Sequence, residues 1–193
     1  MTDGEEAQAS LASAEEGVRR LRRTLDQMMT LARTEATVDK ADYCESVLAV
    51  VSGVLDASPG TARERVGLAV DGEDCGSSMP RSMLETAVRN LVDNALRYSP
   101  EQTRIAVHVQ FGASARQCVL TVADRGPGLS PEEVVLVGRR FWRADQGRQR
   151  KNGTGLGISI VQAIARRFGG ALVLKARDGG GLIAELTIPL RAG

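Results

Sequence analysis

The stretch N-L-V-D-N-A-L-R-Y at residues 90–98 decides the fold. It predicts the second half of a helix that has Pro80 in its first turn and runs to about Arg97. Asn90 and Asn94 are four residues apart, so their amides project from one helix face. An amide oxygen can ligate a hard cation such as Mg²⁺, and an amide NH₂ can donate to phosphate. Taken alone, the pattern also fits a helix with two solvated amides.

A second stretch, D-R-G-P-G-L at residues 124–129, follows an apolar strand predicted for 117–123. The carboxylate of Asp124 stands at the end of that strand, where it needs a hydrogen-bond partner. An adenine amino group is suitable, because a carboxylate accepts hydrogen bonds and cannot donate them. The glycines would let the backbone approach a flat ligand closely. A plain turn between a strand and a helix accounts for this stretch equally well.

A third stretch, G-T-G-L-G-I at residues 153–158, opens a predicted helix. Glycine backbone N–H groups and a helix N-terminus both favour phosphate. The stretch is neither a Walker A loop nor a dinucleotide fingerprint, because it lacks G-K-[ST] and the G-x-G-x-x-G spacing. Residues 143–152, just before it, contain one acidic residue, Asp145, and four basic ones: Arg143, Arg148, Arg150 and Lys151. A solvated loop and a basic lid over a triphosphate both fit.

Around these stretches the sequence predicts a layer of helices on one face of a mixed sheet. Helices are expected at residues 41–57, 80–97, after Ser130 and at 155–168, and strands at 65–70, 104–111, 117–123, 171–176 and 182–189. Residues 112–115 should join two strands in a hairpin. Ser130 and Glu133 form a capping box before a short helix.

The first 36 residues differ from the rest and predict one long amphipathic helix. Its apolar residues recur at alternating spacings of three and four; they are Leu11, Ala14, Val18, Leu21, Leu25, Met28 and Ala32. Such a heptad stripe should pack in a coiled coil or helical bundle. The alternative is a helix lying on the domain that follows it.

Composition narrows the classes of function. The 25 basic and 24 acidic residues give a net charge of +1, which argues against nucleic-acid binding by bulk electrostatics. The three cysteines are isolated, so a disulfide framework or a thiolate zinc site is not expected and a reducing, cytosolic setting fits better. With His108 as the single histidine, multi-histidine metal sites are excluded.

Together and in this order, the three stretches resemble the catalytic ATP-binding domain of sensor histidine kinases, in the superfamily of gyrase B, Hsp90 and MutL. Residues 90–98 resemble the N box, 124–129 the G1 box, Phe141 and Trp142 the F box, and 153–157 the G2 box. The resemblance covers roughly residues 38–190, and the first 36 residues resemble the second helix of the kinase dimerisation domain.

The resemblance implies an α/β two-layer sandwich of the Bergerat type, with a mixed sheet and helices on one face, preceded by one long amphipathic helix. Residues 1–37 would be a partial dimerisation domain that lacks the phosphoacceptor helix, and residues 38–193 the catalytic ATP-binding domain. The cofactors implied are ATP and Mg²⁺.

The resemblance also implies a role for each site residue. Asn94 would ligate Mg²⁺, Asn90 would help to place the phosphates, and Arg97 would contact phosphate; these three form the expected catalytic set. Tyr98 would lie beside the adenine ring and Asp124 would bind its amino group. Further ATP-binding residues are Gly126, Gly128 and Leu129 at the base pocket, and Lys151, Gly153, Thr154, Gly155, Leu156 and Gly157 over the phosphates. Phe141 and Trp142 would anchor the lid, or simply pack in the core.

ATP hydrolases of this superfamily place a glutamate base one turn before the metal-binding asparagine. Here Asn90 occupies that position, and an amide cannot take a proton from water. Asp93 is displaced from Asn94 by about 100° around the helix. The site is therefore expected to transfer the γ-phosphoryl group rather than to hydrolyse ATP, as a protein-histidine kinase. His108 should be a surface residue on the polar face of a strand, so the acceptor histidine must lie in another segment.

The resemblance implies several partners: a dimerisation domain carrying the phosphoacceptor histidine, a response regulator receiver domain and a second copy of the chain, with no nucleic acid. The chain would be the cytoplasmic portion of an inner-membrane sensor, either as a fragment or as a protein acting in trans. Two alternatives remain open. One is a serine/threonine-type kinase of the same superfamily, such as an anti-sigma-factor kinase, and the other is a non-catalytic nucleotide-binding interaction module.

Overall fold

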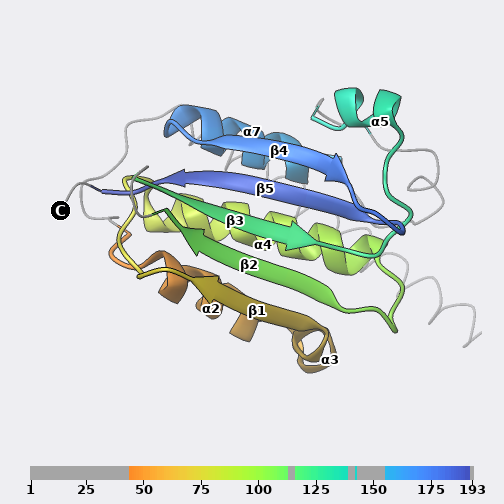
Figure 1. Ribbon diagram of the computed structural model, residues 1–193, viewed down its shortest axis with the longest axis horizontal. Coiled ribbons are helices and arrows are strands. Elements are labelled where there is room, and N and C mark those ends of the chain that lie inside the picture. Colours follow the sequence, from red (N-terminus) through yellow and green to blue (C-terminus); the bar gives the residue numbers. More distant parts are fainter. Residues whose placement is uncertain (1–43, 113–115, 139–141, 143–154, 192–193) are drawn as a thin grey trace, which may run out of the picture.

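The computed structural model describes residues 44–112, 116–138, 142 and 155–191. These residues form a five-stranded sheet with the strand order β1-β2-β3-β5-β4 (Figure 1). The elements in chain order are α2 (Val47–Asp56), α3 (Gly60–Glu64), β1 (Val66–Asp71), α4 (Arg81–Tyr98), β2 (Ile105–Phe111), β3 (Gln117–Ala123), α5 (Pro131–Leu136), α7 (Gly157–Arg167), β4 (Ala171–Ala176) and β5 (Leu182–Pro189). The predicted amphipathic helix of residues 1–37 lies outside the described residues.

The sheet is mixed, as predicted. β1 pairs with β2 in parallel, and every other neighbouring pair is antiparallel. β2 and β3 form the predicted hairpin, and β4 and β5 form a second one. The parallel pair places the beginnings of β1 and β2 at the same end of the sheet, beside the end of β3 and the start of β5 (Figure 1).

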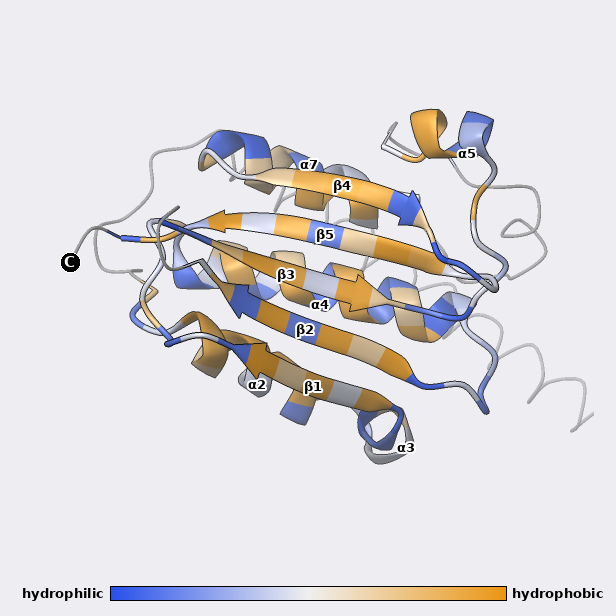
Figure 2. Cartoon of the chain, in the orientation of Figure 1, coloured by the Kyte–Doolittle hydropathy of each residue, from blue (hydrophilic) through white to orange (hydrophobic). Residues whose placement is uncertain are grey.

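Three helices, α2, α4 and α7, cover one face of the sheet, which confirms the predicted α/β sandwich (Figure 1). Along each central strand, successive side chains point alternately into this core and to the opposite face of the sheet. In β2, Ile105, Val107 and Val109 are buried under the helices, while Ala106 and Gln110 are exposed. Figure 2 shows the same alternation as polar interruptions in the apolar strands β2 and β5. We call the opposite side of the sheet, which these three helices do not cover, the open face.

α4 begins and ends close to its predicted limits, with Pro80 at the N-cap rather than inside the first turn. Its core stripe comprises Leu84, Ala87, Val88, Leu91, Val92 and Ala95. α5 carries the predicted capping box, in which the Ser130 hydroxyl accepts from the Glu133 N–H and the Glu133 carboxylate accepts from the Ser130 N–H. α7 ends before Gly169, which has a φ of 77°.

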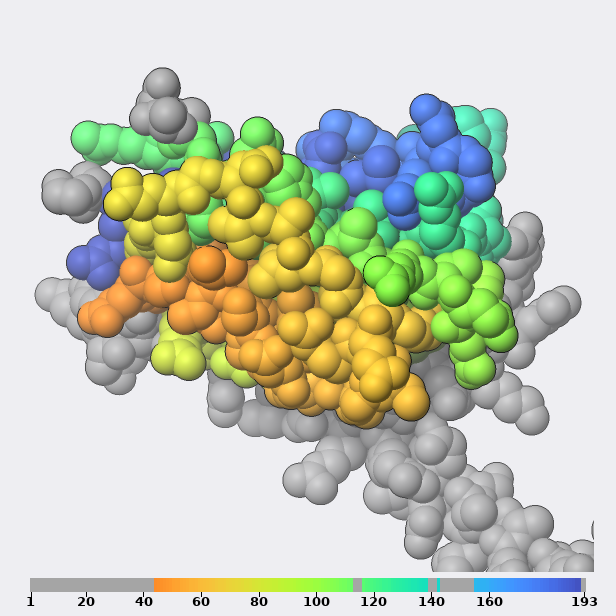
Figure 3. Space-filling view, turned by 60° about the horizontal axis from the view of Figure 1, so that its bottom comes forward, coloured from red at the N-terminus to blue at the C-terminus, as the bar shows by residue number. Residues whose placement is uncertain are grey.

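Two local predictions were wrong. The first helix was expected from residue 41, but Cys44 forms a bridge with Ser77 and α2 begins only at Val47, capped by the Ser46 hydroxyl. The predicted loop after Ser58 contains a further short helix, α3, which begins at Gly60. Figure 3 shows α2, α3 and β1, coloured orange to yellow, together on one side of the molecule. Among the described residues, none of the helices has both the length and the apolar character needed to cross a bilayer.

Candidate functional site

The candidate site lies where α4, the end of β3 and the start of α7 come together. α4 packs beside α7 in the helical layer, and the loop after β3 leaves the sheet at the end where α4 terminates (Figure 1). The fold therefore brings together residues 90–98, residues 124–129 and the described part of the third stretch, residues 155–158.

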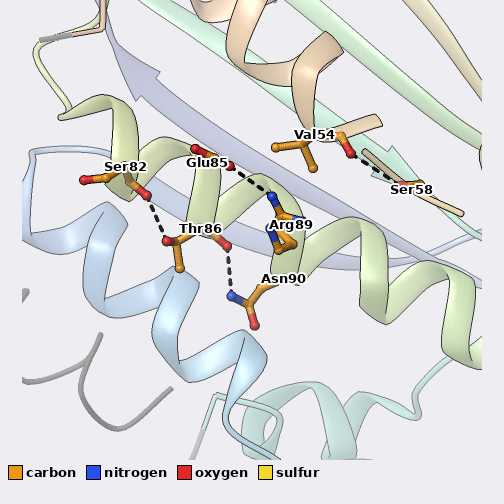
Figure 4. A network of polar contacts seen from close by, with 7 residues as sticks. All are labelled: Val54, Ser58, Ser82, Glu85, Thr86, Arg89 and Asn90. Atoms are coloured by element: carbon orange, nitrogen blue, oxygen red, sulfur yellow. Dashed lines mark hydrogen bonds and ion pairs between the residues drawn. The ribbon is translucent and has the colours of Figure 1, made fainter. Parts of the chain in front are cut away.

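Asn90 links α4 to the beginning of α7. Its amide Nδ2 donates to the Thr86 carbonyl one turn earlier, at 2.8 Å, and its side chain lies on the side of α4 that faces α7 (Figure 4). A methyl group on Gly157, the first residue of α7, would lie 3.0 Å from Asn90 Oδ1. Asn90 of the N box and Gly157 of the G2 box are thus in close contact.

Asn94 lies one turn further along α4 and is half-buried. Within the described part of the chain, its side chain has no hydrogen-bond or ion-pair partner, so its amide oxygen is available to a ligand. Arg97 and Tyr98, at the end of α4, are also half-buried. The structure therefore places Asn94, Arg97 and Tyr98 in the C-terminal part of α4, beyond Asn90 in the middle of the helix.

Asp124 continues the β3 ladder by one residue. Its N–H donates to the Leu182 carbonyl at 2.9 Å, and its Oδ1 accepts from the N–H groups of Gly126 at 2.7 Å and Leu182 at 3.2 Å. Since Leu182 is on the helix side of β5, the Asp124 side chain lies on that side too. Among the described residues, no donor reaches Oδ2. That atom can accept a hydrogen bond from a ligand.

Only 5% of Asp124 is exposed to solvent, and this burial has the largest effect on the pKa of its carboxyl group. Burial raises the pKa of the Asp124 carboxyl, because the charged form loses solvation. The hydrogen bonds from Gly126 and Leu182 and the positive charge of Arg177 act in the opposite direction but do not offset burial. A ligand donor at Oδ2 would therefore stabilise a carboxylate that is poorly solvated.

Gly126 and Gly128 allow the loop after β3 to approach its neighbours closely. A methyl group on Gly126 would lie 3.0 Å from the Tyr98 carbonyl and 3.1 Å from Asp124 Oδ1. Gly128 has a φ of 74° and lies against the Gly181 carbonyl. Leu129, which follows them, is half-buried. The G1 residues thus pack directly against the end of the N-box helix.

The N-terminus of α7 has no side-chain cap. Leu156 is the N-cap residue and is buried, and the Ser159 hydroxyl donates to its carbonyl rather than accepting from the helix N–H groups. Gly155, with a φ of 73°, leads into it. The first N–H groups of a helix have no partner within the helix and carry partial positive charge, so this terminus suits a phosphate group.

Several residues expected at the site cannot be compared with the structure. Phe141, Lys151, Gly153 and Thr154 lie outside the described residues. Trp142 is half-buried. His108 is on the open face, and its Nε2 lies 2.8 Å from Asp71 Oδ2.

Sequence reasoning missed three residues that shape the Asp124 region. The buried Ser99 hydroxyl accepts from the Arg125 N–H at 3.3 Å, and Leu182 donates to the Asp124 carboxylate. Arg177 donates from Nη1 to the Asp124 carbonyl at 2.9 Å. Leu182 and Arg177 come from the β4–β5 hairpin, far along the chain. The one sequence feature that indicated a close backbone approach by this hairpin is the run of glycines at residues 179–181.

We next consider which side chains of the site could ligate a metal ion. Within the described ranges, no three histidine, cysteine or acidic side chains are grouped in a way that could hold a metal. Mg²⁺, however, usually keeps several waters and takes one or two protein ligands together with substrate phosphates. A single amide oxygen from Asn94 fits that mode, with the phosphate position suggested by the start of α7.

The comparisons with known proteins agree with this geometry. Residues 79–192 match the family described as histidine kinase-, DNA gyrase B-, and HSP90-like ATPase. The chain is 32% identical over 189 residues to the sensor protein QseC of Escherichia coli K12, covering 96% of this chain and 40% of QseC. It is 38% identical over 108 residues to the sensor histidine kinase CpxA of the same strain, covering 55% of this chain and 23% of CpxA.

Among solved structures, the mycobacterial sensor histidine kinase MprB is 28% identical and superposes with a TM-score of 0.63, covering 77% of this chain and 97% of that one. The chain thus spans less than half the length of QseC and CpxA. The family match covers more than half of the chain. The chain belongs to the family of histidine kinase-, DNA gyrase B- and HSP90-like ATPases, and carries the catalytic ATP-binding domain of the sensor histidine kinases.

Proposed function

We propose that this domain binds ATP with Mg²⁺ and donates the γ-phosphoryl group to a histidine of a dimerisation domain, as the catalytic portion of a two-component sensor kinase. The proposal rests on the environment of Asp124. This residue is a buried carboxylate whose Oδ1 is held by two backbone N–H groups and whose Oδ2 receives no hydrogen bond from the described residues. Adenine carries an amino donor that matches this acceptor, whereas guanine presents a carbonyl at the equivalent position.

Phosphate binding would fall to residues of α4 and α7. The uncapped N-terminus of α7 supplies N–H groups for the phosphate oxygens, and Asn90 lies in contact with Gly157 at that terminus. Asn94 would hold Mg²⁺, and Arg97 would add positive charge. When bound, Mg²⁺ would neutralise charge on the phosphates. Lys151, Gly153 and Thr154 remain proposed contacts of the same phosphates.

The chemistry supported by these residues is transfer rather than hydrolysis. The attacking atom would be a ring nitrogen of the acceptor histidine, which forms a bond to the γ-phosphorus as the bond to the β–γ bridging oxygen breaks and ADP leaves. Asn90 occupies the position where a base could activate water, and its amide is already hydrogen-bonded to Thr86. The domain would act by positioning and charge neutralisation.

The proposed partners follow from this reaction. A dimerisation domain would carry the acceptor histidine, a response regulator receiver domain would take the phosphoryl group onto an aspartate, and two copies of the kinase would associate through helices like residues 1–37. In the complete sensor the domain would lie on the cytoplasmic side of the inner membrane.

The test is phosphoryl transfer in trans. The chain would be incubated with Mg²⁺ and ATP labelled at the γ-phosphate, together with the dimerisation domain of QseC as acceptor, and both labelled protein and free phosphate would be measured. We expect an acid-labile label on the acceptor and little free phosphate. Asn94→Ala should abolish the label. Steady release of phosphate without labelled acceptor would contradict transfer, and label that persists in Asn94→Ala would contradict the role of Asn94.

A further inference from the structure

The open face of the sheet contains a basic hollow that the proposed ATP site does not use. It has a volume of about 820 Å³ and lies where the beginnings of β1 and β2 meet the loop after β3 and the β4–β5 turn (Figure 1). Its floor comes from small residues, among them Gly67, Ala69 and Ala106. Three arginines, Arg104, Arg125 and Arg177, line it.

This hollow and the proposed adenine position are on opposite sides of the sheet. Gly67 pairs with Ala106, and both belong to the open face, whereas Asp124 is on the helix side with Leu182. The two sites share the short loop at Gly126, and Arg177, which lines the hollow, also donates to the Asp124 carbonyl. A ligand in the hollow would therefore not compete directly with the base of ATP.

The floor is open because its residues carry small side chains or, at Gly67, none. A methyl group on Gly67 would meet no atom within 4 Å, so free space begins directly at the backbone. Longer side chains at Gly67, Ala69 or Ala106 would fill this space. The volume falls in the range of pockets that hold small molecules, about 300–1,000 Å³.

Within the described residues the arginines of the hollow are not held in ion pairs, although the positive charge of Arg177 acts on the Asp124 carboxylate. Arg125 Nη1 donates to the Asp178 carbonyl at 3.2 Å, and Arg177 Nη1 donates to the Asp124 carbonyl at 2.9 Å. Among the described residues, no carboxylate forms an ion pair with Arg104, Arg125 or Arg177. These carbonyl groups hold the guanidinium groups of Arg125 and Arg177 in place, and a carbonyl carries no net charge to neutralise them.

Other charged side chains on the described strands of the open face are paired. His108 contacts Asp71 at 2.8 Å, and Lys175 contacts Glu185 at 2.6 Å. Among the described strand residues of this face, these cations therefore differ from those that line the hollow, since each has an acidic partner. Arg65 adds a fourth cation beside the hollow, hydrogen-bonded to the Pro100 and Thr103 carbonyls. The exposed Asp178 is the acid of the adjoining turn.

We propose that this hollow is a second anion site, which binds a small phosphate-bearing ligand between Arg104, Arg125 and Arg177. Guanidinium groups match phosphate oxygens in charge and in the geometry of their N–H groups. Three such groups around one open floor suit a ligand with more than one negative charge, such as a diphosphate. The inference does not depend on the proposed kinase activity.

The test is a titration with inorganic pyrophosphate, followed by amide NMR. We expect saturable shifts at Gly67, Ala106 and Gly179, which belong to the hollow. Arg104→Gln should weaken this binding by about tenfold or more, equivalent to 1.4 kcal/mol. Arg104 makes no hydrogen bond within the described part of the chain, so its replacement should leave the fold intact. Arg166→Gln, at the far end of α7, is the matched control and should bind as the parent does.

Two results would overturn the proposal. One is an absence of saturable shifts at the hollow, including the case where shifts are confined to Gly157–Ser159 at the start of α7. The other is binding at the hollow that is unchanged in Arg104→Gln. The ATP titration of Asn94→Ala tests the nucleotide site separately, so failure of one proposal is distinguishable from failure of the other.

Discussion

Asn90 and Gly157 are in such close contact that a single methyl group on Gly157 would lie 3.0 Å from the Asn90 amide oxygen. The contact joins the N-box helix α4 to the first residue of α7. It also explains why glycine stands at the start of a helix, where its low helix propensity would otherwise be a disadvantage. The spacing of α4 and α7 at the candidate site depends on this absence of a side chain.

Gly157→Ala should therefore weaken ATP binding and lower stability together. The new methyl group must displace Asn90 or the first turn of α7, both of which are proposed to hold phosphate. We expect a loss of about 1 kcal/mol in the free energy of unfolding, within the usual range for a strained contact. Thermal unfolding and an ATP titration would measure the two effects.

Gly53→Ala is the matched control for that change. Gly53 lies in the middle of α2, where a methyl group meets nothing within 4 Å. It should increase the free energy of unfolding by about 0.5–1 kcal/mol through helix propensity, and leave ATP affinity unchanged. Equal effects of the two alanines on ATP affinity would contradict the account of the Asn90 contact.

Asp124→Asn should distinguish adenine from other bases. The asparagine oxygen can still accept from Gly126 and Leu182, while its NH₂ replaces the free Oδ2 and meets the adenine amino donor. We expect ATP affinity to fall by about tenfold or more, since a mismatched buried donor costs about 1–3 kcal/mol. Calorimetry with ATP and GTP would test this, and unchanged affinity for both nucleotides would exclude the adenine contact.

Asp124→Asn should also change how the free energy of unfolding of the nucleotide-free protein depends on pH. Burial raises the pKa of Asp124 in the folded state, so the folded protein holds the carboxyl proton more tightly than the unfolded chain does. The ionised group therefore lowers the free energy of unfolding as pH rises from the ordinary carboxyl pKa through the raised one.

Asp124→Asn removes that titration. Its gain in free energy of unfolding over the parent should be largest above the raised pKa and should shrink toward zero below the ordinary carboxyl pKa. Urea unfolding of both proteins at about pH 4 and about pH 7 would measure the difference. A gain that is larger at the lower pH would contradict the direction of the shift.

The main elements could be predicted because local signals agreed with tertiary packing. α4 shows an apolar stripe behind Pro80, and α5 has its capping box at Ser130. The G1 and G2 glycines marked positions where φ is positive or backbones meet, as at Gly128 and Gly155. Each of these signals is close in sequence to the helix or turn that it specifies.

What could not be predicted depends on contacts between distant segments. The chain before α2 has helical periodicity, but Cys44 instead pairs with Ser77. α3 is a five-residue helix with no buried residue, so it shows no apolar stripe. The bonds from Leu182 and Arg177 to Asp124 depend on how β5 pairs with β3 and how the turn between β4 and β5 is placed. No pattern near Asp124 identifies those partners.

Asn94→Ala should remove the dependence of ATP binding on Mg²⁺. Its half-buried side chain has no partner among the described residues, and the neighbouring core residues Leu91 and Ala95 are untouched, so thermal unfolding should be nearly unchanged. Asp93→Asn, an exposed neighbour on a different side of α4, is the control and should keep Mg²⁺-dependent binding. A variant that still binds ATP more tightly with Mg²⁺ would remove Asn94 from the metal site.

The most direct measurement is a calorimetric titration of the chain with ATP, with and without Mg²⁺, followed by an assay for released phosphate. The account predicts Mg²⁺-dependent binding with negligible phosphate release, because Asn90 stands where a hydrolase would need a base. Absence of binding would contradict an ATP site at Asp124 and Asn94, and steady hydrolysis would contradict a site built for transfer.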